Sequence, residues 1–256
     1  MHLRNSPRHA AFTWVEMLVV IMCALLLLVF GLLPKLAKGT GGKPRRIYCV
    51  NNLKNIGLAC RILATDNGNC LPWEFTATNR PAALPTNYAP FPGIPLLPSQ
   101  GVAANFALLS NELSSLKLVI CSEDRKRAPV KTNSFAYLMA PAQMANRDRM
   151  VSYFIGTSAR EDLPQSILGG DRNLAGGPFG PDTNTPPSQV ALRVPLTTSR
   201  ASFNRTRYTA DMHENAGNLL LGDGSVQQVS SGRLKEQLWD AKTESQSDLT
   251  FLFPAR

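Results

Sequence analysis

The residues of this chain that could carry acid–base chemistry are few. Of its three histidines, His2 and His9 lie within the first ten residues, so a histidine-based catalytic centre would depend on His213. The carboxylates that could orient its ring are Asp171, Asp211 and Asp223. No second histidine follows at the spacing of a zinc-protease helix, and no Gly-x-Ser-x-Gly element supplies a nucleophile. We therefore predict no enzymatic activity, no catalytic residue, no metal and no cofactor.

The cysteines are the other reactive group. Four of the five lie beyond residue 40: Cys49, Cys60, Cys70 and Cys121. An even number of cysteines in an oxidising compartment permits two disulfides, with three connectivities. Cys49 and Cys60 would lie about 16 Å apart on one straight helix, which exceeds the reach of a disulfide and removes one connectivity. Two connectivities remain, and free buried thiols are the alternative to both.

The net charge of +9 belongs to the N-terminal quarter of the chain. Residues 1–65 carry +8, because they hold nine Lys and Arg and a single acid, Glu16. The other 191 residues carry +1, which argues against a large basic surface for nucleic acid. With 44% hydrophobic and 18% charged residues among 256, the chain can bury a core, which excludes wholesale disorder.

A long apolar segment follows the first basic residues. No charged residue lies between Met17 and Pro34, and about 20 residues of helix cross a bilayer core. The segment predicts a transmembrane helix over residues 12–38, with Glu16 near one end, where a carboxylate costs less than at the centre. A secretory signal peptide is the alternative, but the run is longer than usual and no small-x-small cleavage site follows it. Basic residues on either side suit the anionic headgroups of lipids.

The sequence Ala-Phe-Thr-Trp-Val-Glu-Met-Leu-Val-Val-Ile that begins at Ala11 resembles the N-terminus of type IV prepilins and type II secretion pseudopilins. The resemblance implies that prepilin peptidase cuts a leader of residues 1–11 between Ala11 and Phe12, and that the new amino group is methylated. It also implies that Glu16 aligns subunits in a filament, paired with the terminal amine of a neighbour. The chain departs from the family pattern in having Ala11 in place of glycine and Trp14 in place of an aliphatic residue.

The expected orientation across the membrane follows from this resemblance. More basic residues follow the apolar segment than precede it, which by itself favours a cytoplasmic location for the large domain. In the prepilin family, by contrast, the leader is cytoplasmic and the large domain is extracytoplasmic. We therefore expect a single-pass inner-membrane protein whose domain lies in the periplasm or at the cell surface.

Beyond the apolar segment the chain divides into a joint, a helix and a domain. Residues 39–45 are rich in glycine and form the predicted joint. In residues 46–66 apolar side chains recur at alternating spacings of four and three, which predicts an amphipathic helix: Cys49, Leu53, Ile56, Cys60 and Leu63. Residues 67–256 form the predicted domain, with long Pro- and Gly-rich loops at 72–98 and 175–188.

The domain should contain an antiparallel sheet. Residues 118–121, 152–156 and 167–173 are β-prone runs bounded by turn residues and are predicted to be strands, and 108–118 is predicted to be a short helix. The predicted fold class is α+β and pilin-like, with a transmembrane helix and an amphipathic helix at the N-terminus and the amphipathic helix packed on the C-terminal sheet.

The segment Leu219–Val229 gives the clearest local signal. Asp223-Gly224 lies between two β-prone runs and favours a tight hairpin turn. His213 lies close enough upstream to pack or hydrogen-bond against this hairpin, so His213, Asp223 and Gly224 are assigned structural roles. The nine residues between His213 and Asp223, together with the Cys-Val-Asn-Asn-Leu-Lys-Asn-Ile-Gly stretch that begins at Cys49, resemble a group of large prepilin-type proteins found in planctomycetes and verrucomicrobia.

The expected function is structural. The resemblance implies a subunit of a type II secretion pseudopilus or a type IV pilus-like filament, with prepilin peptidase, other pilin or pseudopilin subunits and the inner membrane as partners. No nucleic-acid partner is expected. The alternative is a membrane-anchored extracytoplasmic binding protein that uses the prepilin signal only for display.

Overall fold

The computed structural model describes residues 13–36, 42–75, 101–143, 145–180 and 191–254. The chain divides into two compact units, Met1–Pro44 and Arg45–Arg256. The α-helices are α1 (Trp14–Leu36), α2 (Gly42–Asp66), α3 (Val102–Leu108), α4 (Ser110–Leu113), α5 (Phe135–Met139) and α6 (Ser231–Ser245). The strands are β1 (Tyr153–Gly156), β2 (Ile167–Asp171), β3 (Leu174–Ala175), β4 (Ala191–Val194), β5 (Arg207–Tyr208), β6 (Ala216–Leu221), β7 (Val226–Ser230) and β8 (Leu249–Leu252). Short 3₁₀ helices are η1 (Pro72–Glu74), η4 (Leu116–Val119), η5 (Pro141–Gln143), η6 (Arg147–Met150), η7 (Gly177–Phe179) and η8 (Arg200–Arg205).

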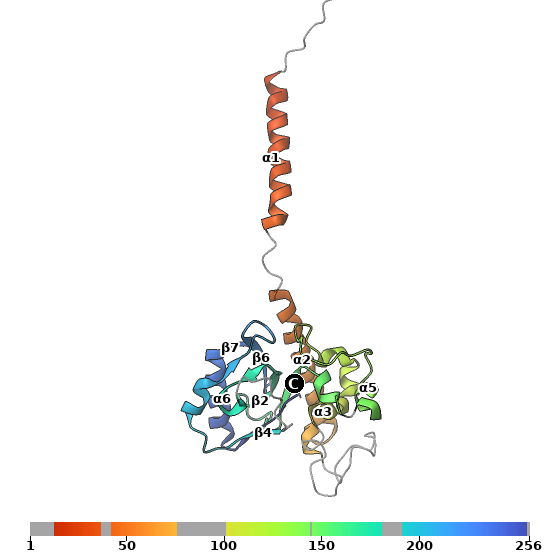
Figure 1. The fold of residues 1–256 in the computed structure, drawn as a ribbon, viewed down its shortest axis with the longest axis vertical. Coiled ribbons are helices and arrows are strands. Elements are labelled where there is room, and N and C mark those ends of the chain that lie inside the picture. Colours follow the sequence, from red (N-terminus) through yellow and green to blue (C-terminus); the bar gives the residue numbers. More distant parts are fainter. Residues whose placement is uncertain (1–12, 37–41, 76–100, 144, 181–190, 255–256) are drawn as a thin grey trace, which may run out of the picture. The chain divides into compact units, whose positions relative to one another are not determined.

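Helix α1 (Figure 1) is built almost entirely from apolar residues, and its large side chains between Trp14 and Phe30 are exposed. Trp14 is 82% exposed, Leu27 76% and Phe30 71%. Among the described residues, no helix is both long enough and apolar enough to cross a membrane. Residues 1–12 and 37–41, which contain the predicted leader and both ends of the predicted membrane segment, lie outside the described residues.

The second unit is built on a six-stranded sheet in the order β4-β8-β1-β2-β6-β7, and every strand pairing in it is antiparallel. Strands β3 and β5 form a separate antiparallel pair. The predicted strands at 152–156 and 167–173 correspond to β1 and β2. The prediction of an α+β fold with an antiparallel sheet is therefore confirmed.

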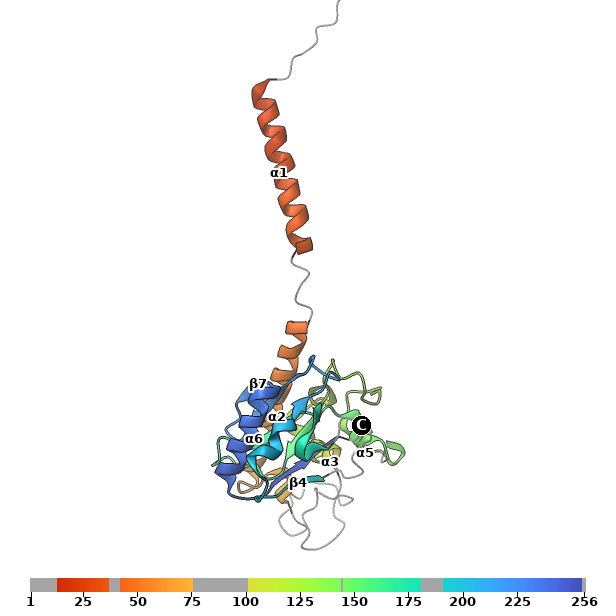
Figure 2. The ribbon, with the colours of Figure 1, turned by 60° about the vertical axis from the view of Figure 1, so that its left-hand side comes forward.

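Both faces of the large sheet are covered by helices (Figures 1 and 2). Successive side chains of a strand point to opposite faces. Accordingly, Tyr153 and Ile155 belong to the core formed with α2 to α5, whereas Phe154 belongs to the core formed with α6. Leu220 and Leu219 of β6 divide between the two cores in the same way. This explains why the central strands are continuous apolar runs in the sequence and do not alternate with polar residues.

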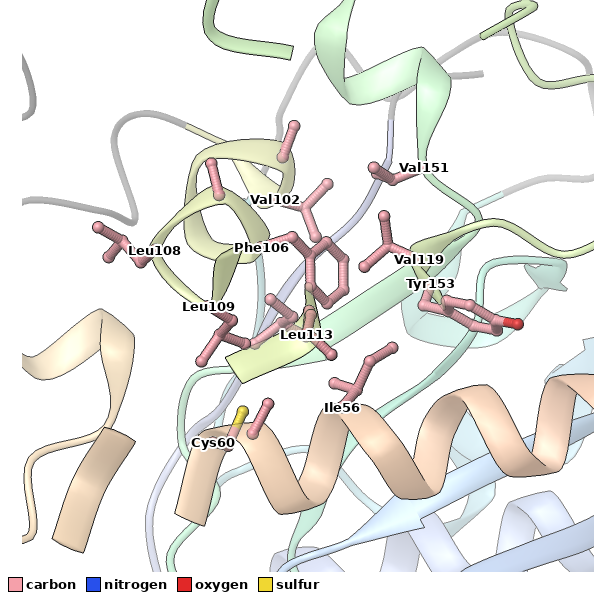
Figure 3. Packing of buried hydrophobic residues seen from close by; sticks show 14 of the residues in the cluster. Ile56, Cys60, Val102, Phe106, Leu108, Leu109, Leu113, Val119, Val151 and Tyr153 are labelled. Carbon is pink, nitrogen blue, oxygen red and sulfur yellow. The ribbon is translucent and has the colours of Figure 1, made fainter. Parts of the chain in front are cut away.

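Helix α2 packs in the first of these cores, as its apolar spacing predicts. Ile56 and Cys60 of α2 point toward Phe106, Leu109 and Leu113 (Figure 3), and all five side chains are buried. The helix ends at Asp66, as predicted, but it begins at Gly42. Four residues of the predicted joint are therefore helical, and this is possible because Pro44 falls in the first turn, where its missing N–H is not needed.

The structure corrects the prediction for residues 108–121. The predicted helix is replaced by two shorter ones, α3 and α4, and Ser114 ends α4 in the left-handed conformation (φ 59°). The predicted strand at 118–121 is wrong, because Leu116–Val119 form the 3₁₀ helix η4, whose first turn is capped by Ser115. A four-residue apolar run can be buried in a strand or in a helical turn, so its composition alone does not decide between them.

The predicted hairpin is present, since β6 and β7 pair from Ala216↔Ser230 to Leu220↔Val226. Gly224 occupies the turn with φ 81°. Gly224→Val should destabilise the domain by about 1 kcal/mol or more, because a β-branched residue resists positive φ. Urea unfolding of the unit of residues 45–256 measures this, with Gln228→Val on the exposed side of β7 as the control that should unfold near the wild-type midpoint. An unchanged midpoint for Gly224→Val would contradict the turn assignment.

Candidate functional site

Four side chains from distant parts of the sequence form one buried group, which we call the cysteine–histidine cluster: Cys49, Cys121, Asp171 and His213. The Sγ atoms of Cys49 and Cys121 lie 2.7 Å apart. The Nε2 atom of His213 lies 3.5 Å from Cys121 Sγ and 3.5 Å from Asp171 Oδ2. Both cysteines and the side chains of His213 and Asp171 are no more than 1% exposed. The cluster therefore lies inside the domain, out of contact with solvent.

The turn that carries His213 is held by the amide of a single asparagine. Asn173 Nδ2 donates to the backbone carbonyls of Thr209, Met212 and Ala216 at 2.9, 2.9 and 3.2 Å. His213 itself has a left-handed backbone (φ 50°) and its carbonyl accepts from Ala216 N, the first residue of β6. The side chain of His213 lies against Cys121 and Asp171.

Helix α2 is fixed against the domain one turn before and about one turn after Cys49. Arg46 Nη2 donates to Gly217 O at 2.7 Å, and Arg46 Nε donates to Asn218 Oδ1 at 3.3 Å. Asn52 Nδ2 lies 3.2 Å from Ile120 O. These bonds set the rotation and the register of α2, so Cys49 is brought to Cys121 by contacts that do not involve either sulfur.

The charges in the cluster depend on one another. Burial raises the pKa of Asp171 to about 7, although its Oδ2 accepts hydrogen bonds of 2.8 Å from both nitrogens of Asn218. A hydrogen bond from Cys121 lowers the pKa of Cys49 to about 5, against the effect of burial, and His213 adds to this lowering. Burial opposes the charged form of His213, but its bond to Cys49 and the negative charges of Asp171 and Cys49 raise its pKa.

The pKa of Cys121 shifts in the opposite direction to that of Cys49. It is raised because Cys121 donates its proton to Cys49 and because its side chain is buried. The two thiols therefore differ, and loss of a proton is favoured at Cys49 over Cys121.

The geometry of the cluster differs from that of a catalytic Cys-His-Asp triad. In such a triad the two ring nitrogens have separate partners, one the nucleophile and the other the orienting carboxylate. Here Nε2 of His213 faces both Cys121 and Asp171. The sulfurs are also buried, so a substrate could reach them only after the domain opens.

Three of the four residues have donor atoms within metal-binding reach of one another. The donor atoms of Cys49, Cys121 and His213 all lie within 4.8 Å of each other, and thiolate and imidazole are ligands that zinc prefers. However, two sulfurs bound to one tetrahedral zinc lie about 3.8 Å apart. The observed separation of 2.7 Å between the sulfurs is much shorter, so the pair as it stands does not fit zinc.

No family model, no curated protein and no solved structure matches this chain. The roles of its residues are therefore argued from their own geometry.

The predicted site residues that the structure describes lie in different elements. Glu16 lies in the first turn of α1, where its carboxylate accepts from Thr13 N at 2.9 Å and from Thr13 Oγ1 at 3.0 Å. Ala11 and Phe12 lie outside the described residues. Asp223 and Gly224 form the hairpin turn, and Asp223 Oδ1 accepts from Ser225 N at 2.8 Å.

His213 makes the predicted hydrogen bond to the hairpin through its backbone, and its ring has contacts that the sequence did not show. Its backbone supports the start of β6, but its ring contacts Cys121 and Asp171 and not the hairpin turn. Cys60 lies in the apolar core of α2 and α3 (Figure 3), and Cys70 lies near the end of α2, with its Sγ 3.9 Å from Gly68 O. Among the four cysteines considered, Cys49 and Cys121 are thus the pair that the fold brings together.

Proposed function

We propose that this chain is a structural subunit of a pilus-like filament, either a type II secretion pseudopilus or a type IV pilus-like assembly, anchored in the inner membrane by α1 until it assembles. The observation that carries the proposal is the surface of α1. Between Trp14 and Phe30 its apolar side chains are exposed, and the one carboxylate of the helix is that of Glu16, in the first turn. Such a surface needs lipid or other apolar helices around it.

The support for a membrane segment comes from the sequence, where no charge lies between Met17 and Pro34. The support for assembly comes from the exposed apolar side chains of each unit. The Arg45–Arg256 unit buries two cores of its own. Helix α2 also exposes apolar side chains on its outer face: Ile47, Tyr48, Leu58 and Ile62. A row of this kind suits contact with a neighbouring subunit.

Processing is the first test. Under the proposal, protein isolated from its native host begins at Phe12 and carries a methylated amino group. Intact mass and N-terminal sequencing decide this. An uncut chain in cells with active prepilin peptidase, or a mature chain that starts elsewhere, would overturn the prepilin assignment. The recovery of this protein in sheared surface fractions separates a filament subunit from a membrane-anchored binding protein, which would stay with the cells.

Glu16→Ala should leave insertion and cleavage intact but reduce filament yield, because the terminal amine of a neighbouring subunit would lose its counter-charge. The Thr13 contacts offer a competing explanation, in which Glu16 only caps the start of α1. Glu16→Gln distinguishes the two, since glutamine keeps an oxygen that can accept from Thr13 but has no charge. The proposal predicts that Gln fails as Ala does in sheared-filament yield. Wild-type yield from Glu16→Gln would show a capping role and contradict the charge pairing.

A further inference from the structure

We propose that Cys49 and Cys121 form a disulfide bond that joins helix α2 covalently to the segment after η4. The inference rests on the proposed function in one respect, because export to an oxidising compartment is what would expose these thiols to an oxidant in the cell. It selects this pair from the connectivities that the sequence leaves open, and it assigns the buried sulfurs a chemical role that the filament proposal does not require.

The position of the sulfurs is the first argument. Their separation of 2.7 Å is shorter than two unbonded thiols favour, and a small side-chain adjustment brings it to the covalent distance of about 2.05 Å. The opposite adjustment, to the spacing of two zinc ligands, would have to be larger. The pair therefore lies nearer to a disulfide than to a metal site.

The second argument is that hydrogen bonds which involve neither sulfur hold the backbone on each side of the cysteine pair. On α2, Arg46 bonds to Gly217 and Asn52 bonds to Ile120 O, the residue next to Cys121. On the other side, Val119 O accepts from Ser152 N at 3.0 Å, which ties the segment after η4 to the start of β1. A disulfide closed here would join two elements that already lie in register, so the backbone need not move.

The surroundings favour the chemistry of bond formation. The thiolate of Cys49 attacks a sulfur of a disulfide-bearing oxidant, such as an oxidised dithiol oxidase, and one thiol of the oxidant leaves. Cys121 then attacks the sulfur of Cys49 in this mixed disulfide and expels the second thiol. Nε2 of His213, 3.5 Å from Cys121 Sγ, lies where it could take the proton that Cys121 gives up. In total the pair loses two electrons and two protons, and the oxidant is reduced to a dithiol.

Burial sets the order of events. Because neither sulfur is more than 1% exposed, the oxidant must act before α2 is fully packed, and the finished bond is shielded from reductants. The bond closes the chain between residues 49 and 121. It fastens the helix that follows the apolar segment to the core of the domain, so that a pull along the chain from that segment would be carried by a covalent link.

The test is a map of the bond in the full-length protein. The chain is refolded in a glutathione redox buffer, its remaining thiols are blocked with N-ethylmaleimide, and it is digested without reduction. The expected result is one cross-linked peptide that joins Cys49 and Cys121, and an intact mass lower by two hydrogen atoms. Alkylation of both cysteines, or a bond to any other cysteine, would overturn the proposal. The proposal would also be overturned if refolding with zinc raised the intact mass by one zinc ion and protected both thiols from alkylation. That result would indicate a metal site.

Stability gives a second readout. Reduction of the wild type should lower the midpoint of urea unfolding by on the order of 1 M, because the loop between the two cysteines is long. The double variant Cys49→Ala with Cys121→Ala should show no effect of reductant, whereas the control Cys23→Ser, in α1, should respond as the wild type does. Equal midpoints for oxidised and reduced wild type would contradict the proposed link. The peptide map still decides the question if the double variant fails to fold.

Thiol trapping in intact cells of the native host separates this proposal from the filament proposal. Detection of the Cys49–Cys121 cross-link in cells would support both the proposed disulfide and the export of the domain to an oxidising compartment. If the pair forms on refolding but is alkylated in cells, the pairing proposed for the mature protein in its host is wrong. Processing and filament recovery are measured without reference to these cysteines, so the filament proposal can stand or fall separately.

Discussion

Arg172→Met should destabilise the domain by about 3–5 kcal/mol, because it leaves the buried carboxylate of Asp124 without its partner. Arg172 Nη2 donates to Asp124 Oδ1 at 2.7 Å, and Arg172 Nε lies 2.7 Å from Asp124 Oδ2. The side chains are 5% and 1% exposed. The pair joins the end of β2 to the segment after Cys121, next to the cysteine–histidine cluster, and neither charge can be hydrated in place.

The matched control is a second Arg–Asp pair of the same two-bond geometry. Arg160 donates to both carboxylate oxygens of Asp162 at 2.9 and 2.8 Å, but the two side chains are more than 60% exposed. Arg160→Met should therefore unfold in urea close to the wild-type midpoint, because water solvates the released charge. The double variant Asp124→Leu with Arg172→Met replaces both buried partners. It should lose less free energy of unfolding than Arg172→Met alone. Equal effects of the buried and the exposed substitution would refute the role of burial.

Gly156→Ala should destabilise the domain by about 3 kcal/mol, which is the upper end of the usual range for overpacking. Gly156 ends β1, and a Cβ built there would lie 1.8 Å from the backbone oxygen of Ile167. The β2–β6 pairing shifts register between Ile167 and Gly169, so the obstructing carbonyl belongs to an irregular part of β2. A backbone atom cannot rotate away as a side chain can, and the two strands would have to separate.

Gly232→Ala in α6 is the control for this substitution. Its Cβ would meet only Ser230 Oγ, at 3.8 Å, which is ordinary contact, and alanine is favoured over glycine within a helix. The control should be neutral or slightly stabilising in urea unfolding followed by tryptophan fluorescence, which reports on the buried Trp73. If the two alanine variants unfold at the same midpoint, β1 and β2 are not packed as described.

Features of this fold that depend on neighbouring residues can be predicted from the sequence. The spacing of Cys49, Leu53, Ile56 and Cys60 is enough to predict α2 and its buried face, because a helix repeats every 3.6 residues. Asp223-Gly224 is enough to predict the hairpin, because the turn needs a residue that tolerates positive φ. In both cases the physical requirement and the residues that meet it lie within one or two turns of chain.

Features that depend on distant residues follow from the packing of the whole domain. The apolar run at 118–121 is compatible with a strand or a 3₁₀ turn, and the packing of the core selects the turn. The four residues Cys49, Cys121, Asp171 and His213 follow one another at intervals of 42 to 72 residues, so no local spacing shows that they meet. Their contact results from the register that Arg46 and Asn52 impose on α2 and from the turn that Asn173 holds. Those hydrogen bonds join residues that are far apart in the chain, and for that reason the meeting of Cys49 and Cys121 could not be read from the sequence.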